Sequence, residues 1–189
     1  MRNSEAWGRR KREEPSTTVD LADKIEMSVS ADVAWRHMQD IKAVAACIPG
    51  LVPGSIEQVS EDTFRGTLRH LALGVPSTWQ LEAAVTRADP DRRLLIHLEG
   101  EEERLDLHLS GDAALSIDQV DELAALTYTG DLTVRGRLAG AGGPIIERVV
   151  ASIIERFVES VGAGGQVAPR RSWWWRFVAW LTAPFGRRD

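Results

Sequence analysis

The chain has 189 residues and a formal net charge of −5, and 43% of its residues are hydrophobic, which fits one domain of ordinary size with tails. Its single cysteine, Cys47, excludes an intramolecular disulfide framework and favours a reduced, cytosolic setting. No run of about 18 apolar residues occurs, so no segment is expected to cross a bilayer as a helix.

Charge is unevenly distributed along the chain. Residues 1–18 carry five Arg/Lys against three Glu, a net of +2, and residues 169–189 carry five Arg against one Asp, a net of +4. Residues 19–168 therefore carry −11. Basic tails on an acidic body suggest that the tails seek an anionic surface which the body avoids, and solvated ends are the alternative. We expect residues 1–20 to form a disordered basic tail.

The first part of the domain is predicted to contain one strand and two short helices. Residues 21–29 alternate partially between apolar and polar side chains, as a strand does. Ser30 is a suitable N-cap for a helix at 31–39. A second helix at 41–46 is ended by the Pro and Gly that follow it.

Six further strands are predicted with only short breaks between them. They lie at about 51–60, 62–73, 76–88, 92–100, 104–117 and 123–136. Several show period-two alternation, so one face of the sheet is dry and the other wet, as antiparallel sheets allow. No long helix interrupts these strands, which excludes a doubly wound α/β fold.

A helix at 142–161 organises the rest of the chain. Its apolar residues recur at helical spacing and form a wide stripe, while charged residues fill the opposite face. Pro144 suits the first turn, and the glycines after residue 161 end the helix. Such a stripe needs a sheet to cover it. We therefore predict an α+β fold in which a curved antiparallel sheet of about seven strands surrounds this helix.

The order of these elements resembles the helix-grip fold of the START and Bet v 1 superfamily of lipid and small-molecule carriers. Within that superfamily, Cys47-Ile48-Pro49-Gly50 is similar to the "CIPG" element of the carbon monoxide dehydrogenase CoxG family. The turn at Leu73-Gly74-Val75-Pro76 lies where that family has a glycine-containing turn. The resemblance covers about residues 22–162. It departs at 101–103, three consecutive glutamates, where relatives tend to be glycine-rich.

Residue types that carry catalysis or bind metals are scattered. The four histidines show no ligand spacing, and His97 and His108 fall on the wet face of their strands, so solvated histidines are expected. Cys47 has an apolar context and is interpreted as a packed thiol rather than a nucleophile. No nucleophile elbow or phosphate-binding loop is present. We therefore expect no enzyme activity, no metal, no covalently bound cofactor and no nucleic-acid partner.

The inward strand positions are almost wholly apolar, which is typical of a pocket for an apolar ligand. Tyr128 is the one polar group expected there, either bonded to a ligand carbonyl or to the backbone. A filled core without a pocket is the alternative. The expected lining is Trp35, Met38, Ile48, Trp79, Leu81, Leu107, Tyr128, Val149, Ile153 and Phe157. The expected portal lies between the 47–54 loop and the 71–76 turn, at Cys47, Pro49, Gly50, Leu71, Leu73, Gly74 and Pro76.

The C-terminal segment has the composition of a membrane anchor. Trp173 to Phe185 would measure about 20 Å as a helix, too short for a hydrocarbon core of about 30 Å. Tryptophan prefers the headgroup level, and arginines bind anionic leaflets, so we predict an amphipathic interfacial segment at 173–186 after a flexible linker at 163–172. Packing on the domain or a partner is the alternative. The membrane-facing residues would be Arg170, Arg171, Trp173, Trp174, Trp175, Phe177, Trp180, Leu181, Phe185, Arg187 and Arg188.

Three functions are compatible with these features. The first is a non-catalytic carrier on the cytoplasmic face of the cell membrane; the family resemblance implies that it serves a molybdenum-containing carbon monoxide dehydrogenase by anchoring it or passing it a quinone. Menaquinone or another isoprenoid lipid would suit a dry pocket. The second is a recruitment module for that enzyme without a ligand. The third is a helix-grip enzyme, which would need more polar groups in the cavity than the sequence provides.

Overall fold

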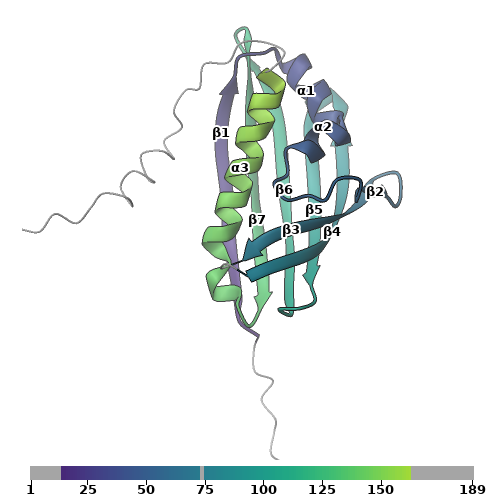
Figure 1. Ribbon diagram of the computed structural model, residues 1–189. Coiled ribbons are helices and arrows are strands. Elements are labelled where there is room, and N and C mark those ends of the chain that lie inside the picture. The colour runs from purple at the N-terminus through teal and green to yellow at the C-terminus, as the bar shows by residue number, and fades with distance from the viewer. Residues whose placement is uncertain (1–13, 73–74, 163–189) are drawn as a thin grey trace, which may run out of the picture.

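The structure is a computed structural model that describes residues 14–72 and 75–162. Seven strands, three α-helices and two short 3-10 helices make up this part of the chain (Figure 1). In chain order they are β1 (Ser16–Met27), α1 (Ala31–Gln39), α2 (Ile41–Ala46), β2 (Glu57–Gln58), β3 (Thr63–Ala72), β4 (Val75–Ala88), η1 (Asp89–Asp91), β5 (Arg93–Glu102), β6 (Leu107–Val120), β7 (Leu123–Gly136), η2 (Ala139–Ala141) and α3 (Gly143–Gly162).

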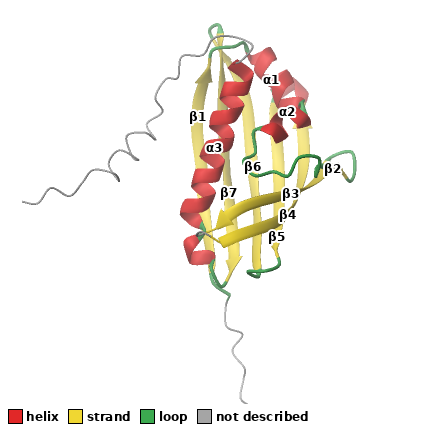
Figure 2. Cartoon of the chain, viewed as in Figure 1, coloured by secondary structure: helices red, strands yellow, loops and turns green. Residues whose placement is uncertain are grey.

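The strands form one antiparallel sheet in the order β1-β7-β6-β5-β4-β3-β2. From β2 to β7 each strand pairs with the next one along the chain, whereas β1 pairs with β7, from Ser16 opposite Arg135 to Met27 opposite Ala124. The sheet stays open between β1 and β2. It curves around α3, which lies along the concave face (Figure 2). The predicted helix-grip fold is confirmed.

The three helices begin and end close to the predicted positions. Helices α1 and α2 match 31–39 and 41–46. The side chain of Asp40 caps α2 by accepting bonds from the backbone N–H groups of Lys42 and Ala43 at 2.9 and 3.2 Å, which satisfies two donors that the first turn leaves free. Helix α3 runs one residue later at each end than predicted, and its apolar stripe faces the sheet.

Two predictions at the strand level are wrong. The N-terminal tail was expected to continue to residue 20, but β1 begins at Ser16 because Val19 is buried and Thr18 bonds Thr133 across the sheet at 2.8 Å. The strand expected at 51–60 is only Glu57–Gln58 plus an isolated bridge between Leu51 and Leu68. The reason is local: Pro53 cannot donate to a ladder, and Gly54 has a positive φ of 75°.

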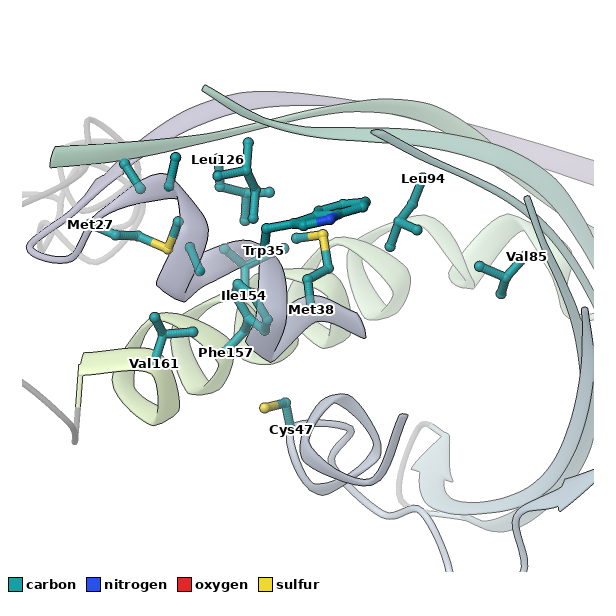
Figure 3. Packing of buried hydrophobic residues seen from close by; sticks show 14 residues of the cluster. Met27, Trp35, Met38, Cys47, Val85, Leu94, Leu126, Ile154, Phe157 and Val161 are labelled. Atoms are coloured by element: carbon teal, nitrogen blue, oxygen red, sulfur yellow. The ribbon is translucent and has the colours of Figure 1, made fainter. Parts of the chain in front are cut away.

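The hydrophobic core occupies one half of the space between α3 and the sheet (Figure 3). It combines the C-terminal half of α3 with α1 and with the ends of the strands beneath them. Its members include Met27, Trp35, Met38, Leu126, Ile154, Phe157 and Val161, each no more than 9% exposed. Helix α1 therefore covers this half of the interior. The residues around the N-terminal turns of α3 are not part of this core.

The predicted linker at 163–172, the predicted anchor at 173–186 and most of the predicted N-terminal tail lie outside the described residues. Within the part of the chain that the structure describes, no helix combines the length and apolarity needed to cross a membrane.

Candidate ligand-binding site

An apolar cavity of about 280 Å³ lies between the N-terminal half of α3 and the sheet. Every strand from β3 to β7 contributes to its wall, and the segment from Leu138 into α3 closes one side. The lining consists of Ile48, Leu68, His70, Trp79, Leu81, Leu98, Leu105, Leu107, Leu109, Leu132, Val134, Leu138, Ala141, Gly142, Ile145, Ile146, Val149, Val150 and Ile153. Apart from His70, these walls offer water nothing to bond and suit a hydrocarbon.

Strand alternation explains how the wall is built. Trp79 and Leu81 are two residues apart on β4, so both side chains point to the concave face. Gly100 of the neighbouring strand β5 lies opposite Leu81 and leaves room for both side chains. A Cβ atom at position 100 would lie only 2.7 Å from a methyl group of Leu81. The glycine allows the two large side chains to lie across the sheet.

His70 is the one polar side chain among the described lining residues. It also lines a second, open hollow of about 440 Å³ on the β3–β4 hairpin, together with Arg69, Leu71, Pro76, Ser77 and Thr78. His70 thus contributes to the walls of both the internal cavity and the external groove. The histidine was not predicted as a site residue. Its alternation with Leu68 on β3 was the available signal.

The ten residues expected to line a pocket fall into three groups. Ile48, Trp79, Leu81, Leu107, Val149 and Ile153 lie in the cavity wall. Met38, Phe157 and again Ile153 lie around a smaller apolar space of about 110 Å³ under α1 and α2. Trp35 is 7% exposed in the core, and Tyr128 packs against the same core. Neither of these two residues is part of either wall.

Tyr128 lies outside the cavity because of its position along β7. It pairs with Asp23 of β1, nearer to the filled core than Leu132 and Val134, which do line the cavity. Burial, and to a lesser extent the charge of Asp23, raises the pKa of the phenol above its ordinary value of 10.0. The phenol therefore stays protonated at neutral pH and belongs to the filled half of the fold.

The loop at 47–54 is hydrogen-bonded to β3 along part of its length. The backbone of Gly50 accepts a bond from Arg69 N–H at 2.8 Å, and Val52 N–H donates to the Thr67 carbonyl at 2.9 Å. Gly50 has a φ of 84°, and a Cβ there would collide with the Arg69 carbonyl oxygen. Of the other portal residues, Leu71 and Pro76 line the external groove, Pro49 is partly buried, and Leu73 and Gly74 lie outside the described residues.

Cys47 is buried and has polar neighbours that sequence spacing did not indicate. Its Sγ donates to the Ala43 carbonyl at 3.3 Å and lies 3.5 Å from Ser160 Oγ on α3. Ser160 donates its hydroxyl proton to the Phe157 carbonyl, so the 2.8 Å contact with His37 Nε2 requires that nitrogen to be the donor. This arrangement joins α1, α2 and α3, and in it the imidazole is not a base toward Ser160.

The remaining expectations about polar residues concern the sheet surface. His97 and His108 are exposed, and the hydrogen bond from His97 to Asp112 at 2.8 Å raises the His97 pKa above 6.5. Of the glutamates at 101–103, where the family resemblance departs, Glu101 and Glu102 end β5 and Glu103 lies in the turn that follows. Glu102 is 3% exposed and accepts bonds from the N–H groups of Thr78 and Leu105 at 3.3 and 2.6 Å. No cluster of three or more potential metal ligands occurs among the described residues.

The described fold and its apolar cavity define a START-like helix-grip domain. A structural comparison matches a conserved protein from Geobacillus kaustophilus, with a TM-score of 0.67 and 19% identity, over 78% of this chain and 96% of that one. It also matches the Zhui aromatase/cyclase from Streptomyces sp. R1128 (0.57, 15%, 80% and 100%) and a START superfamily protein from Mycobacterium smegmatis (0.51, 16%, 76% and 94%). At these identities the likeness establishes the fold.

The family is established by sequence. A profile of the carbon monoxide dehydrogenase CoxG family matches residues 24–163, and the chain belongs to that family. The family membership implied by the resemblance is confirmed by this match. A search of curated proteins finds no match to the chain.

Proposed function

We propose that this chain is a non-catalytic carrier of an apolar ligand and that it serves a molybdenum-containing carbon monoxide dehydrogenase at the membrane. One observation carries the proposal: a cavity of about 280 Å³ whose described lining is apolar except for His70. An unfilled apolar space inside a folded domain costs stability, because its walls lose dispersion contacts. A hydrocarbon ligand restores those contacts.

The chemistry of the cavity supports a quinone, with menaquinone as the specific candidate. The cavity of about 280 Å³ lies just below the usual range of ligand pockets, about 300–1,000 Å³, so it would hold a ring system and only the start of an isoprenoid tail. The remainder of the tail would leave along the groove on the β3–β4 hairpin. A quinone would also explain why an apolar cavity, a membrane location and a partner enzyme occur together, because it can carry electrons between an oxidising enzyme and the bilayer.

The composition of the wall supports binding over catalysis. General acid–base chemistry needs titratable groups within hydrogen-bonding reach of the reacting atoms, and His70 is the one titratable group among the described lining residues. The Zhui aromatase/cyclase shares the fold, but a shared fold does not imply a shared activity.

The tails support a peripheral location on the cytoplasmic leaflet. The tryptophans and arginines of residues 170–188 have the composition of an interfacial segment. The acidic body would be repelled by anionic lipid and is free to bind the partner enzyme. The name of the family supports carbon monoxide dehydrogenase as that partner.

The proposal is tested by organic extraction of the full chain purified from a quinone-containing host, followed by mass spectrometry. We expect a stoichiometric isoprenoid quinone. In the Val149→Arg variant the extract should lose it, because this change puts a charge into the apolar wall. Glu147→Arg, at an exposed position two residues away, is the matched control and should keep the cargo.

Each other outcome has a definite meaning. A different apolar lipid in the extract would keep the carrier and replace menaquinone as the cargo. An empty extract from a well-folded sample would reject the carrier and favour recruitment of the enzyme without a ligand.

A further inference from the structure

The β3–β4 hairpin contains a buried hydroxyl group without a hydrogen-bond partner. Ser77 is 3% exposed, and its Oγ makes no hydrogen bond within the described part of the chain. Leaving a buried donor unpaired costs about 1–3 kcal/mol. Buried groups of this kind are uncommon in folded proteins, and each requires an explanation.

Two relations place this hydroxyl beside the cavity. Ser77 precedes Trp79 and Leu81 at two-residue spacing on β4, so its side chain is on the same face of the sheet as those two cavity residues. It also pairs directly with His70. Side chains opposite each other in an antiparallel pair have Cβ atoms about 4.5–5.5 Å apart. The unpaired hydroxyl and the polar residue of the cavity are therefore cross-strand neighbours.

A third polar group on this face restricts the charge of a ligand. Glu102 follows Leu98, a cavity residue, at even spacing on β5 and is buried. Both of its carboxylate oxygens already accept backbone N–H groups, from Thr78 and Leu105. A carboxylate held in this way opposes a second negative charge nearby. A neutral oxygen acceptor fits beside it better than an anionic headgroup.

We propose that His70 and Ser77 bind the polar end of the cavity ligand by hydrogen bonds to a neutral carbonyl oxygen. The ligand is then oriented, with its carbonyl at the hairpin side of the cavity and its hydrocarbon among the leucines and the α3 side chains. The inference rests on the proposed carrier function. It adds a specificity element to it, because His70 and Ser77 distinguish a ring ketone from a hydrocarbon of the same shape.

The test compares two probes in the full chain: menadione, which has the naphthoquinone carbonyls, and methylnaphthalene, which has the ring without them. Dissociation constants are measured by equilibrium dialysis for the wild type, Ser77→Ala, His70→Leu and the control Gln80→Ala. Gln80 is exposed, is on the other face of β4 and lines neither the cavity nor the groove. Loss of one hydrogen bond should weaken menadione binding about three- to tenfold in the first two variants. Methylnaphthalene binding should not change, and Gln80→Ala should affect neither probe.

Stability measurements separate a binding role from a folding role. Removing an unpaired buried hydroxyl should leave the melting temperature of Ser77→Ala unchanged or raise it. Equal losses for both probes, or unchanged menadione binding in both variants, would overturn the inference while the carrier function stands. A wild-type protein that binds neither probe would overturn both.

Discussion

Tyr128 shows at the scale of one residue how the two halves of the fold differ. It is the only tyrosine in the chain and was expected to be the polar group of the cavity. Alternation along β7 correctly indicates its face, because Leu126, Tyr128, Leu132 and Val134 are evenly spaced. Alternation does not indicate how far along the strand the packing changes from a filled core to a cavity, and this depends on where α1 lies.

The phenol of Tyr128 gives a pH-dependent prediction. Burial and Asp23 raise its pKa above 10.0, so the folded state keeps the proton longer than the unfolded chain does. The free energy of unfolding should therefore fall as the pH rises from about 10 toward the folded pKa. An ultraviolet titration reports this single tyrosine directly. Asp23→Asn should lower the pKa only in part, because burial is the larger cause; a return to 10.0 would contradict that order.

His70 and Ile48 illustrate what residue patterns can and cannot predict about the site. Ile48 was among the predicted lining residues, and the cavity residues of β4 and α3 were predicted from their period. His70 was missed because a lone histidine in a strand is usually solvated, and its contact with the cavity depends on how the hairpin bends toward α3. Sequence alternation carries no information on that bend.

At the scale of secondary-structure elements, α3 serves both halves of the interior. Its C-terminal half packs in the core, and its N-terminal half lines the cavity. Ile153 lies at the division and contributes to both the 280 Å³ cavity and the 110 Å³ space. The helix itself could be predicted because its period and its terminal Pro and Gly are local features. The sequence could not predict which half of α3 packs in the core and which lines the cavity, because this depends on where α1 and α2 cover the sheet.

Shortening Ile153 should join the two spaces. We expect Ile153→Ala to lower the free energy of unfolding by about 2 kcal/mol, near the lower end for such truncations because the side chain is only partly buried. It should also raise the affinity for quinones with longer tails relative to menadione. Urea unfolding and equilibrium dialysis measure the two effects, and Glu155→Ala, at an exposed site on the same helix, is the control. An unchanged affinity ratio would show that Ile153 does not limit the length of the ligand.

At the scale of the whole molecule, negative charge is concentrated in the body of the chain and positive charge in its two tails. Residues 19–168 carry −11, and the C-terminal 21 residues carry +4. An anionic membrane would repel the body and attract the tail, which favours attachment through the tail alone. If the tail binds the membrane as proposed, the cavity would lie on the aqueous side of the surface, within reach of the proposed partner enzyme.

Replacing Trp173, Trp174, Trp175 and Trp180 with Ser should release the chain from anionic liposomes, because tryptophan supplies most of the interfacial apolar area. Co-sedimentation measures the bound fraction, and circular dichroism should show an unchanged domain. Trp7→Ser, in the other tail, is the matched control and should remain bound. Continued co-sedimentation of the fourfold variant would rule out the anchor.

The pairing of β1 with β7 also determines how the domain is assembled during synthesis. Strands β3 to β7 form a meander in which each strand can pair with its predecessor as it emerges. The first strand synthesised must wait for Leu123–Gly136, which emerges much later in synthesis. At about 5–20 residues per second this delay is roughly 5–20 s. Throughout that interval the N-terminal strand lacks its partner in the sheet, so the chain is most exposed to misassembly before β7 is made.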